Sequence, residues 1–252
     1  MSRAMSGPAV ELRNVTKRFA QGARPILDGV SFRVERGETL VLLGSSGAGK
    51  TTTLRTINRL VEPDEGEVEV EGREIRSWDP IRLRRRTGYV IQDVGLLPHW
   101  TVFANVELVP KLEGWSPERR RERARELLTL VGLPPDRFGH VRPSALSGGE
   151  RQRVGVARAL AVDPPILLMD EPFGALDSVN RRRLQDEFRE MKEKLGKTIV
   201  FVTHDVREAM KLADRIGVMH GGMLLQLGTP AEILEQPADD FIAELVRLES
   251  AG

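Results

Sequence analysis

The stretch "LVLLGSSGAGKTTTL", from Leu40 to Leu54, joins an apolar run to a loop of small residues, a lysine and three threonines. The eight residues from Gly44 to Thr51 match the pattern G-x-x-x-x-G-K-[ST]. The apolar run predicts a buried central strand, and from Lys50 to Leu60 the pattern becomes helical. A strand, a glycine-rich loop and a helix in this order are typical of a phosphate-binding loop.

Each part of this loop has a chemical reason. Small residues let successive backbone N–H groups point at phosphate oxygens, and the following helix adds its partial positive charge. Lys50 would reach the β- and γ-phosphates, and the Thr51 hydroxyl would ligate Mg²⁺. The alternative, a glycine- and serine-rich turn with a chance lysine, is disfavoured because strand, loop and helix are all in place. We therefore predict a nucleoside triphosphate site made of Gly44, Ser45, Ser46, Gly47, Ala48, Gly49, Lys50, Thr51 and Thr52.

Composition excludes several classes of protein. The 252 residues are 40% hydrophobic and 30% charged, as in ordinary globular proteins, and the net charge of +1 gives no sign of a nucleic-acid partner. The absence of cysteine rules out disulfides and thiolate chemistry. No window approaches the roughly 20 apolar residues of a membrane helix, and the N-terminus lacks the apolar core of a signal peptide. If the protein works at a membrane, another protein must hold it there.

The remaining sequence alternates between strand and helix patterns. Strands are expected over 9–19, 39–44, 88–92, 165–172 and 197–205, two short strands over 26–38, a possible edge strand over 66–72, and a hairpin over 215–228. The block 101–160 is helical and heavily charged, with a start signal at Ser116 and a stop signal at Gly132. This alternation predicts an α/β fold with a mainly parallel sheet and an inserted helical lobe.

The apolar run "ILLMDE", from Ile166 to Glu171, ends in two acids. Asp170 could hold the Mg²⁺ shell, directly or through water, and Glu171 could act as general base on an attacking water. A strand that ends in two solvated acids is the simpler alternative, but the presence of a phosphate loop in the same chain makes it the less favoured one. His204, after another apolar run, could contact the γ-phosphate, although a single histidine there is also typical of a plain surface residue.

The stretch "ALSGGERQRVGVARAL", from Ala145 to Leu160, adds a second small-residue loop at a helix start. Together with the phosphate loop, "ILLMDEP", "GALD" and "VTHD", it resembles the ATP-binding cassette ATPases over nearly the whole chain. The resemblance implies a P-loop NTPase core with a mainly parallel sheet, an antiparallel β subdomain and an inserted α-helical subdomain. The expected limits are an ATPase domain over 8–252 (core 8–94 and 163–235, helical subdomain about 95–162) and a helical tail over 236–252.

In that family the second loop serves the nucleotide of a partner subunit, and two subunits packed head to tail enclose two ATP molecules. The residues carried over to this role form the signature of the family and are Ser147, Gly148, Gly149 and Glu150. Locally, Ser147 can cap the helix and Glu150 can complete a capping box, which is compatible with the family role. Glu150 stands where many relatives have glutamine, and we expect no loss of activity from it.

The resemblance also assigns the remaining site residues. Phe19 matches the aromatic side chain that stacks on adenine, although a buried strand residue is the alternative. Gln92 matches the glutamine that touches Mg²⁺ or water and links the nucleotide to the transporter, and Asp177 matches the loop that contacts the partner. The implied catalytic residues are Glu171, His204, Lys50 and Gln92, and the implied metal-binding residues are Thr51, Gln92 and Asp170. The implied cofactors are ATP and Mg²⁺.

The implied mechanism is a cycle of dimer closure and opening. ATP binding closes the dimer because each nucleotide is shared between Lys50 of one subunit and Ser147 of the other, and hydrolysis reopens it. The expected partners are a second, identical cassette, transmembrane permease subunits that receive the motion near Gln92, and a substrate-binding protein or domain acting through the permease. The expected location is peripheral, on the cytoplasmic face of the inner or plasma membrane.

DNA-handling members of the family are the main alternative to a transporter. They separate the phosphate loop from the signature by a long coiled coil, whereas the segment between Lys50 and Ser147 is short and has no sustained heptad pattern. Translation-linked relatives carry two cassettes per chain, and this chain has one. The arginine runs at 84–86, 119–121 and 181–183 lie among acids and indicate solvated helix faces, so we expect no nucleic-acid partner.

The stretch "GYVIQDVGLLPHWTVFANVELVPKLEGW", from Gly88 to Trp115, favours a narrower function. It resembles the cassettes of osmoprotectant importers, which take up glycine betaine, choline, carnitine or related quaternary amines. An importer for another small polar solute, such as an amino acid, is the alternative. Many members of that subgroup continue into a pair of regulatory domains, and since this sequence ends at Gly252 we expect no regulatory domain here.

Overall fold

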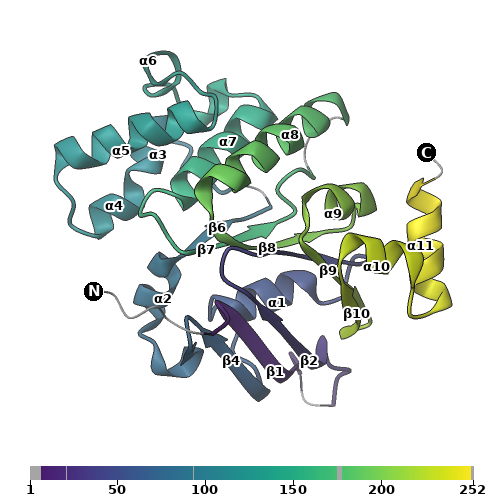
Figure 1. Cartoon of the computed structure of the whole chain (residues 1–252). Coiled ribbons are helices and arrows are strands. Elements are labelled where there is room, and N and C mark those ends of the chain that lie inside the picture. Colours follow the sequence, from purple (N-terminus) through teal and green to yellow (C-terminus); the bar gives the residue numbers. More distant parts are fainter. Residues whose placement is uncertain (1–6, 21, 93, 175–177, 251–252) are drawn as a thin grey trace. The chain divides into compact units, whose positions relative to one another are not determined.

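The computed structural model describes residues 7–20, 22–92, 94–174 and 178–250 (Figure 1). The chain forms two compact units, one made of Met1–Arg84 with Thr198–Gly252 and the other of Arg85–Lys197. The first unit contains the phosphate loop, and the second contains the signature and the acidic strand end. The family resemblance predicts a helical subdomain over about 95–162, and these limits differ from those of the two compact units. The subdomain limits stay a prediction.

The first unit contains an antiparallel sheet with strand order β2-β1-β4-β5. Its strands are β1 (Val10–Lys17), β2 (Leu27–Val34), β4 (Glu65–Val70) and β5 (Arg73–Glu74). Two details of the prediction were wrong. The segment 26–38 forms one strand rather than two, because β2 stays paired with β1 through register shifts near Val15. Strand β4 is not at the edge, because β5 pairs with it on the side away from β1.

The first unit also contains a run of strands ordered β10-β9-β3-β8. They are β3 (Thr39–Leu43), β8 (Thr198–Thr203), β9 (Arg215–His220) and β10 (Met223–Gly228). Strand β3 pairs in parallel with both β8 and β9. Every residue of β3 and β8 is buried, as the continuous apolar runs predicted. The predicted hairpin is confirmed, with Gly221 and Gly222 at φ 55° and 87° in the turn.

Short helices accompany these strands. They are α1 (Lys50–Ile57), the 3₁₀ helix η1 (Ile75–Ser77), α2 (Pro80–Arg86), α9 (Val206–Leu212), α10 (Pro230–Glu235) and α11 (Asp240–Ser250). Helix α1 ends earlier than the expected Leu60. Its buried Leu54 and Ile57 anchor it, and each such side chain contributes about 1.5–3 kcal/mol on burial. None of the helices in the described part of the chain combines the length and apolar content needed to span a bilayer.

The described part of the second unit has two parallel strands and seven helices. The strands are β6 (Thr87–Val90) and β7 (Ile166–Asp170). The helices are α3 (Val102–Val106), α4 (Leu108–Leu112), α5 (Pro117–Leu130), α6 (Pro135–Phe138), η2 (Pro143–Ala145), α7 (Gly148–Ala159) and α8 (Ser178–Leu195). The predicted start of α5 is confirmed, because the Ser116 hydroxyl accepts the Arg119 N–H at 3.3 Å. Parallel strands, an antiparallel sheet and helices together agree with the predicted α/β class.

Candidate nucleotide-binding site

The phosphate loop begins where β3 ends. In the parallel pairing of β3 with β8, Leu43 lies opposite Thr203, so Gly44 and His204 follow at the same edge of the sheet. The carboxyl ends of parallel strands are where α/β proteins bind their ligands. The fold therefore brings together two segments that lie about 160 residues apart in the sequence and that the motif analysis assigned to one nucleotide.

Three glycines allow the loop to take its path. A Cβ at Gly44 would lie 2.2 Å from the carbonyl oxygen of Met219. At Gly49, where φ is 100°, a Cβ would lie 2.6 Å from the carbonyl oxygen of Ile26. Gly47 has φ 80° and no described atom within 4 Å of the Cβ position, so the space beside it is open. The loop is closely backed at two glycines and open at the third, as a cradle for phosphates requires.

Lys50 and the start of α1 make the loop suited to an anion. The Lys50 side chain is buried, and its Nζ donates to the carbonyls of Gly44 and Ser45 at 2.6 and 2.8 Å. The N-cap residue of α1 is Gly49, which has no side chain to cap the helix, and the first turn of α1 contains no acid. The backbone N–H groups at this positive helix end favour phosphate oxygens. Thr51 and Thr52 lie in this first turn.

Phe19 and His204 are both exposed. Phe19 follows β1 and keeps 68% of its surface exposed, with Lys17 Nζ 6.0 Å from the ring centroid. The alternative of a buried strand residue is therefore wrong, and an aromatic face is available for a base. His204 comes just before Asp205, which caps α9 by accepting the N–H groups of Arg207 and Glu208.

The acidic strand end is organised within the second unit. Strands β6 and β7 run parallel with Val90 opposite Met169, so Gln92 and the two acids follow at one edge. The Gln92 amide donates to Glu171 Oε2 at 3.3 Å. Glu171 has φ 44°, a left-handed backbone conformation that costs a non-glycine residue on the order of 1–2 kcal/mol and is typical of functional sites.

Asp170 has a partner that the sequence analysis missed. The carboxylate is 4% exposed, and its Oδ2 accepts the Tyr89 hydroxyl at 3.4 Å. Tyr89 belongs to β6, and only the parallel register of β6 with β7 brings it near. No local pattern in the sequence reveals this pair.

The signature forms the start of α7. Ser147 accepts the Glu150 N–H at 3.3 Å, and Glu150 Oε2 accepts the Ser147 N–H at 2.7 Å. The predicted capping box is therefore confirmed. A hydroxyl that accepts this bond still has a proton to donate, so capping does not prevent a contact with phosphate.

Arg158 is a second residue that the sequence analysis missed. From α7 it donates to the carbonyls of Val94 and Gly95 at 2.5 and 2.7 Å, just after Gln92. Burial lowers the pKa of Arg158 from its ordinary value, though an arginine remains charged at neutral pH. This guanidinium holds the backbone at Val94 and Gly95 to the helix that begins with the signature.

The residues predicted to hold Mg²⁺ suit that ion in their chemistry. The Thr51 hydroxyl, the Gln92 amide oxygen and the Asp170 carboxylate are hard oxygen ligands, which Mg²⁺ prefers. The described residues contain no cluster of three acids, histidines or cysteines that would hold a metal ion alone. Mg²⁺ in nucleotide sites needs only one or two protein ligands besides the phosphates. Asp177 lies outside the described residues, so its predicted role is not addressed.

A strand, a glycine-backed loop, a buried lysine and an acidic strand end define a nucleotide-binding cassette. Residues 27–174 match the family model of the ABC transporter, and the chain belongs to this family. It is 50% identical over 241 residues to the choline transport ATP-binding protein OpuBA of Bacillus subtilis (strain 168), covering 94% of this chain and 62% of that protein. It is 48% identical over 243 residues to the glycine betaine uptake system ATP-binding protein YehX of Escherichia coli (strain K12), covering 96% and 78%.

A solved structure agrees with this assignment. It is a dimeric ATP-binding cassette in a post-hydrolysis state, bound to ADP and Pi. The TM-score is 0.78 at 37% identity, over 88% of this chain and 98% of that one. The chain spans about 60% of the length of several of its curated relatives, such as OpuBA.

Proposed function

We propose that this chain is the ATP-binding and ATP-hydrolysing subunit of an importer for an osmoprotectant, such as glycine betaine or another quaternary amine. The phosphate loop carries the ATPase part of the proposal, because Lys50 and the glycine-backed turn suit a triphosphate. The relatives named for choline and glycine betaine uptake support the choice of solute. An importer for another small polar solute, such as an amino acid, is the second candidate.

In this proposal each group of residues in the site has a separate role. Gly44 to Thr52 hold the phosphates, with Lys50 on the β- and γ-phosphates and Phe19 against the base. Thr51, Gln92 and Asp170 would hold Mg²⁺, which neutralises phosphate charge when bound. Glu171 accepts a proton from the attacking water, and His204 contacts the γ-phosphate.

A second copy of the chain would complete the site. Ser147, Gly148, Gly149 and Glu150 would bind the nucleotide of the partner, and Asp177 would contact the partner near it. The dimeric state of the solved cassette supports this assembly. A working dimer would sit peripherally on the cytoplasmic face of the membrane, with no nucleic acid involved.

A groove in the second unit supports contact with a permease. It measures about 370 Å³ and is lined by Trp100, Thr101, Ala104, Glu107, Lys111 and Arg120. Trp100 keeps 38% of its surface exposed, and a large exposed apolar side chain that lines a groove is typical of a protein interface. We propose that a permease segment binds here and, through a substrate-binding protein or domain, links hydrolysis to uptake.

The ATPase assignment is tested with Glu171→Gln. The purified variant should bind ATP, with hydrolysis falling about 10²- to 10⁴-fold, because the amide cannot accept the proton of water. Glu122→Gln, at an exposed position on α5, is the matched control and should hydrolyse ATP normally. Hydrolysis by Glu171→Gln at the wild-type rate would refute the assignment of the base.

The solute is tested by capture and uptake. The tagged protein, isolated with gently solubilised membranes, should bring down a permease. A host that lacks its other osmoprotectant importers should take up labelled glycine betaine only with the wild-type chain and not with Glu171→Gln. Uptake of a labelled amino acid instead would favour the second candidate, and DNA-associated proteins in place of a permease would refute a transport role.

A further inference from the structure

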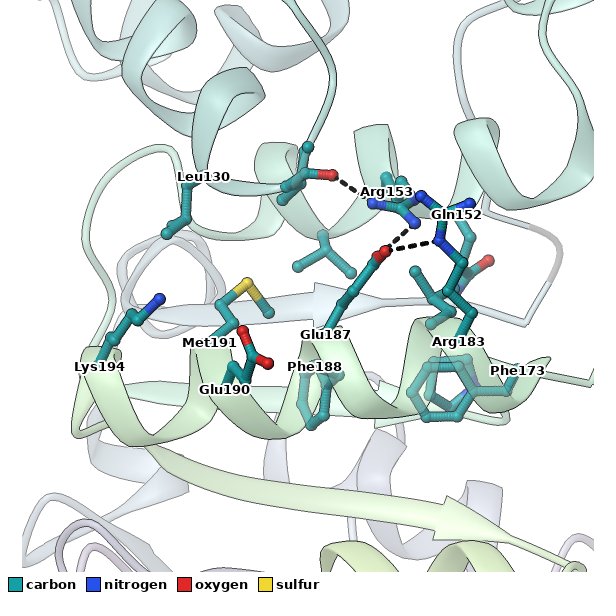
Figure 2. Close-up of a pocket in the computed structure, with 15 residues that line it drawn as sticks. Leu130, Gln152, Arg153, Phe173, Arg183, Glu187, Phe188, Glu190, Met191 and Lys194 are labelled. Carbon is teal, nitrogen blue, oxygen red and sulfur yellow. Dashed lines mark hydrogen bonds and ion pairs between the residues drawn. The ribbon is translucent and has the colours of Figure 1, made fainter. Parts of the chain in front are cut away.

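A cavity of about 280 Å³ lies within the second unit (Figure 2), and none of the residues that line it belongs to the phosphate loop. Its walls come from the end of α5, one side of α7, the residues just after β7 and one side of α8. For scale, a cavity of about 150 Å³ lined by apolar side chains is enough to bind benzene. This cavity therefore has room for a single-ring molecule with a short polar arm.

Most of the wall is apolar. Leu130, Val156, Phe173, Phe188 and Met191 line it. The rings of Phe173 and Phe188 meet edge to face with centroids 5.9 Å apart. Aromatic rings and a methionine sulfur favour contact with another aromatic ring. Figure 2 shows Phe188 and Met191 on α8, below Leu130.

The polar part of the wall has one unsatisfied donor. Gln152 is 4% exposed, and its Nε2 makes no hydrogen bond to any described residue. A buried amide without a partner costs on the order of 1–3 kcal/mol, so such a group calls for an explanation. A ligand that accepts this hydrogen bond is one explanation with a testable consequence.

The charges beside Gln152 favour an anion. Glu187 pairs with two arginines, Arg153 from α7 and Arg183 from its own helix, as the dashed lines in Figure 2 show. Arg153 also donates to the carbonyl of Val131 at 2.8 Å. Lys194 and Glu190 also line the cavity, so its three cationic side chains exceed its two carboxylates by one charge, which attracts a further carboxylate.

We propose that this cavity is a binding site for a small aromatic monocarboxylate. Its ring lies among the apolar side chains, and its carboxylate accepts the Gln152 N–H next to the Arg153 and Arg183 cluster. The site is distinct from the nucleotide, permease and partner contacts of the proposed function.

The position of the cavity links it to the nucleotide site. Gln152 lies on the helix that begins with Ser147 at its N-cap, and Phe173 comes two residues after Glu171. A bound ligand would therefore touch the signature helix and the segment that carries the general base. A regulatory effect on hydrolysis rests on the proposed function, whereas binding itself does not.

The first test is binding of 3-phenylpropanoate to the wild-type chain without nucleotide. With methyl-¹³C methionine labelling, the Met191 signal, assigned from Met191→Leu, should shift on titration with a Kd of about 0.1–3 mM, as expected for so small a compound. The other methionines serve as internal controls. The alcohol 3-phenylpropan-1-ol should bind about tenfold more weakly, because it lacks the carboxylate.

Two variants locate the probe. Gln152→Leu should weaken binding of the acid about tenfold and binding of the alcohol less, because a hydroxyl oxygen accepts a weaker hydrogen bond than a carboxylate. Val156→Phe should fill the cavity and abolish both, while Leu234→Phe, at an exposed position of the first unit, should change neither. No saturable Met191 shift in the wild-type chain, or equal binding of acid and alcohol, would overturn the proposal without any variant having to fold.

The regulatory consequence has a separate readout. Saturating 3-phenylpropanoate should change the ATPase rate of the wild-type chain but not that of Val156→Phe. A Met191 shift with no change in rate would keep the site and refute its regulatory role. If the chain has no ATPase activity, the proposed function fails while the binding result stands.

Discussion

Alanine substitution at the three loop glycines separates steric clash from backbone strain. Gly47→Ala meets open space but keeps φ at 80°, so it should cost only the left-handed strain of about 1–2 kcal/mol. Gly44→Ala has no such φ, but its Cβ would lie 2.2 Å from the Met219 carbonyl oxygen. Moving strand β9 by roughly 1 Å to relieve this contact should cost about 1–3 kcal/mol, as overpacking does.

Gly49→Ala combines both terms. Its φ is 100° and its Cβ would lie 2.6 Å from the Ile26 carbonyl oxygen, so the expected cost is about 2–5 kcal/mol. Each substitution also stiffens the unfolded chain by about 0.4–1 kcal/mol, but this term is nearly the same at all three positions. The order of the three losses therefore tests the geometry of the loop directly.

The assay is urea unfolding without nucleotide, so that ATP affinity cannot contribute. Trp78 is the tryptophan of the first unit, and Trp100→Phe with Trp115→Phe makes its fluorescence the sole tryptophan signal. Gly49→Ala should lose the most stability. Equal losses for Gly47→Ala and Gly49→Ala, or a loss below about 0.5 kcal/mol for Gly44→Ala, would refute the close backing of the loop by Ile26 and Met219.

Three further predictions concern single side chains. Gln152→Leu should raise the free energy of unfolding by about 1 kcal/mol, because it removes a buried amide N–H that has no partner among the described residues, and a lower free energy in urea unfolding would mean that this N–H has a partner. The Lys17 ammonium and then the Arg18 N–H lower the pKa of Asp64 in the folded protein. The charged Asp64 carboxylate therefore stabilises the fold fully above the ordinary pKa of aspartate, and this stabilisation is lost as the pH falls through the lowered pKa. Asp64→Asn should therefore be less stable than wild type at pH 7, with a gap that closes on acidification below about pH 4, and a constant gap would contradict this. Arg158→Met should cost about 3 kcal/mol, because two carbonyls lose a charged donor, and unchanged unfolding would exclude these bonds from stability.

The sequence predicted correctly those features whose interactions lie between residues close together in the chain. The loop from Gly44 to Thr51, the Gly221–Gly222 turn and the caps at Ser116 and Ser147 each depend on residues within a few positions of one another. Their hydrogen bonds and φ angles follow from nearest neighbours, so a single sequence is enough to find them.

Long-range pairing explains what the sequence could not predict. The predicted edge strand became an inner one because the two residues of β5, too few for a visible pattern, pair with it. Tyr89 reaches Asp170 only through the parallel register of β6 and β7. The sequence allowed Phe19 to be either a buried strand residue or an exposed residue that stacks on a base. It is exposed because it lies beyond the end of β1, and the sequence pattern did not show where that strand ends.

Helix α7 is where the interactions of the second unit converge. Its first turn carries the signature and is closed by the capping box of Ser147 and Glu150. Arg153, in the second turn, pairs with Glu187 of α8, and Arg158 holds the carbonyls that follow Gln92. Because one helix bears all three, we expect a displacement at Val94–Gly95 or at α8 to be transmitted to the signature. In the proposed importer, helix α7 would therefore connect both the permease contact and the cavity beside Gln152 to the residues that bind the partner nucleotide.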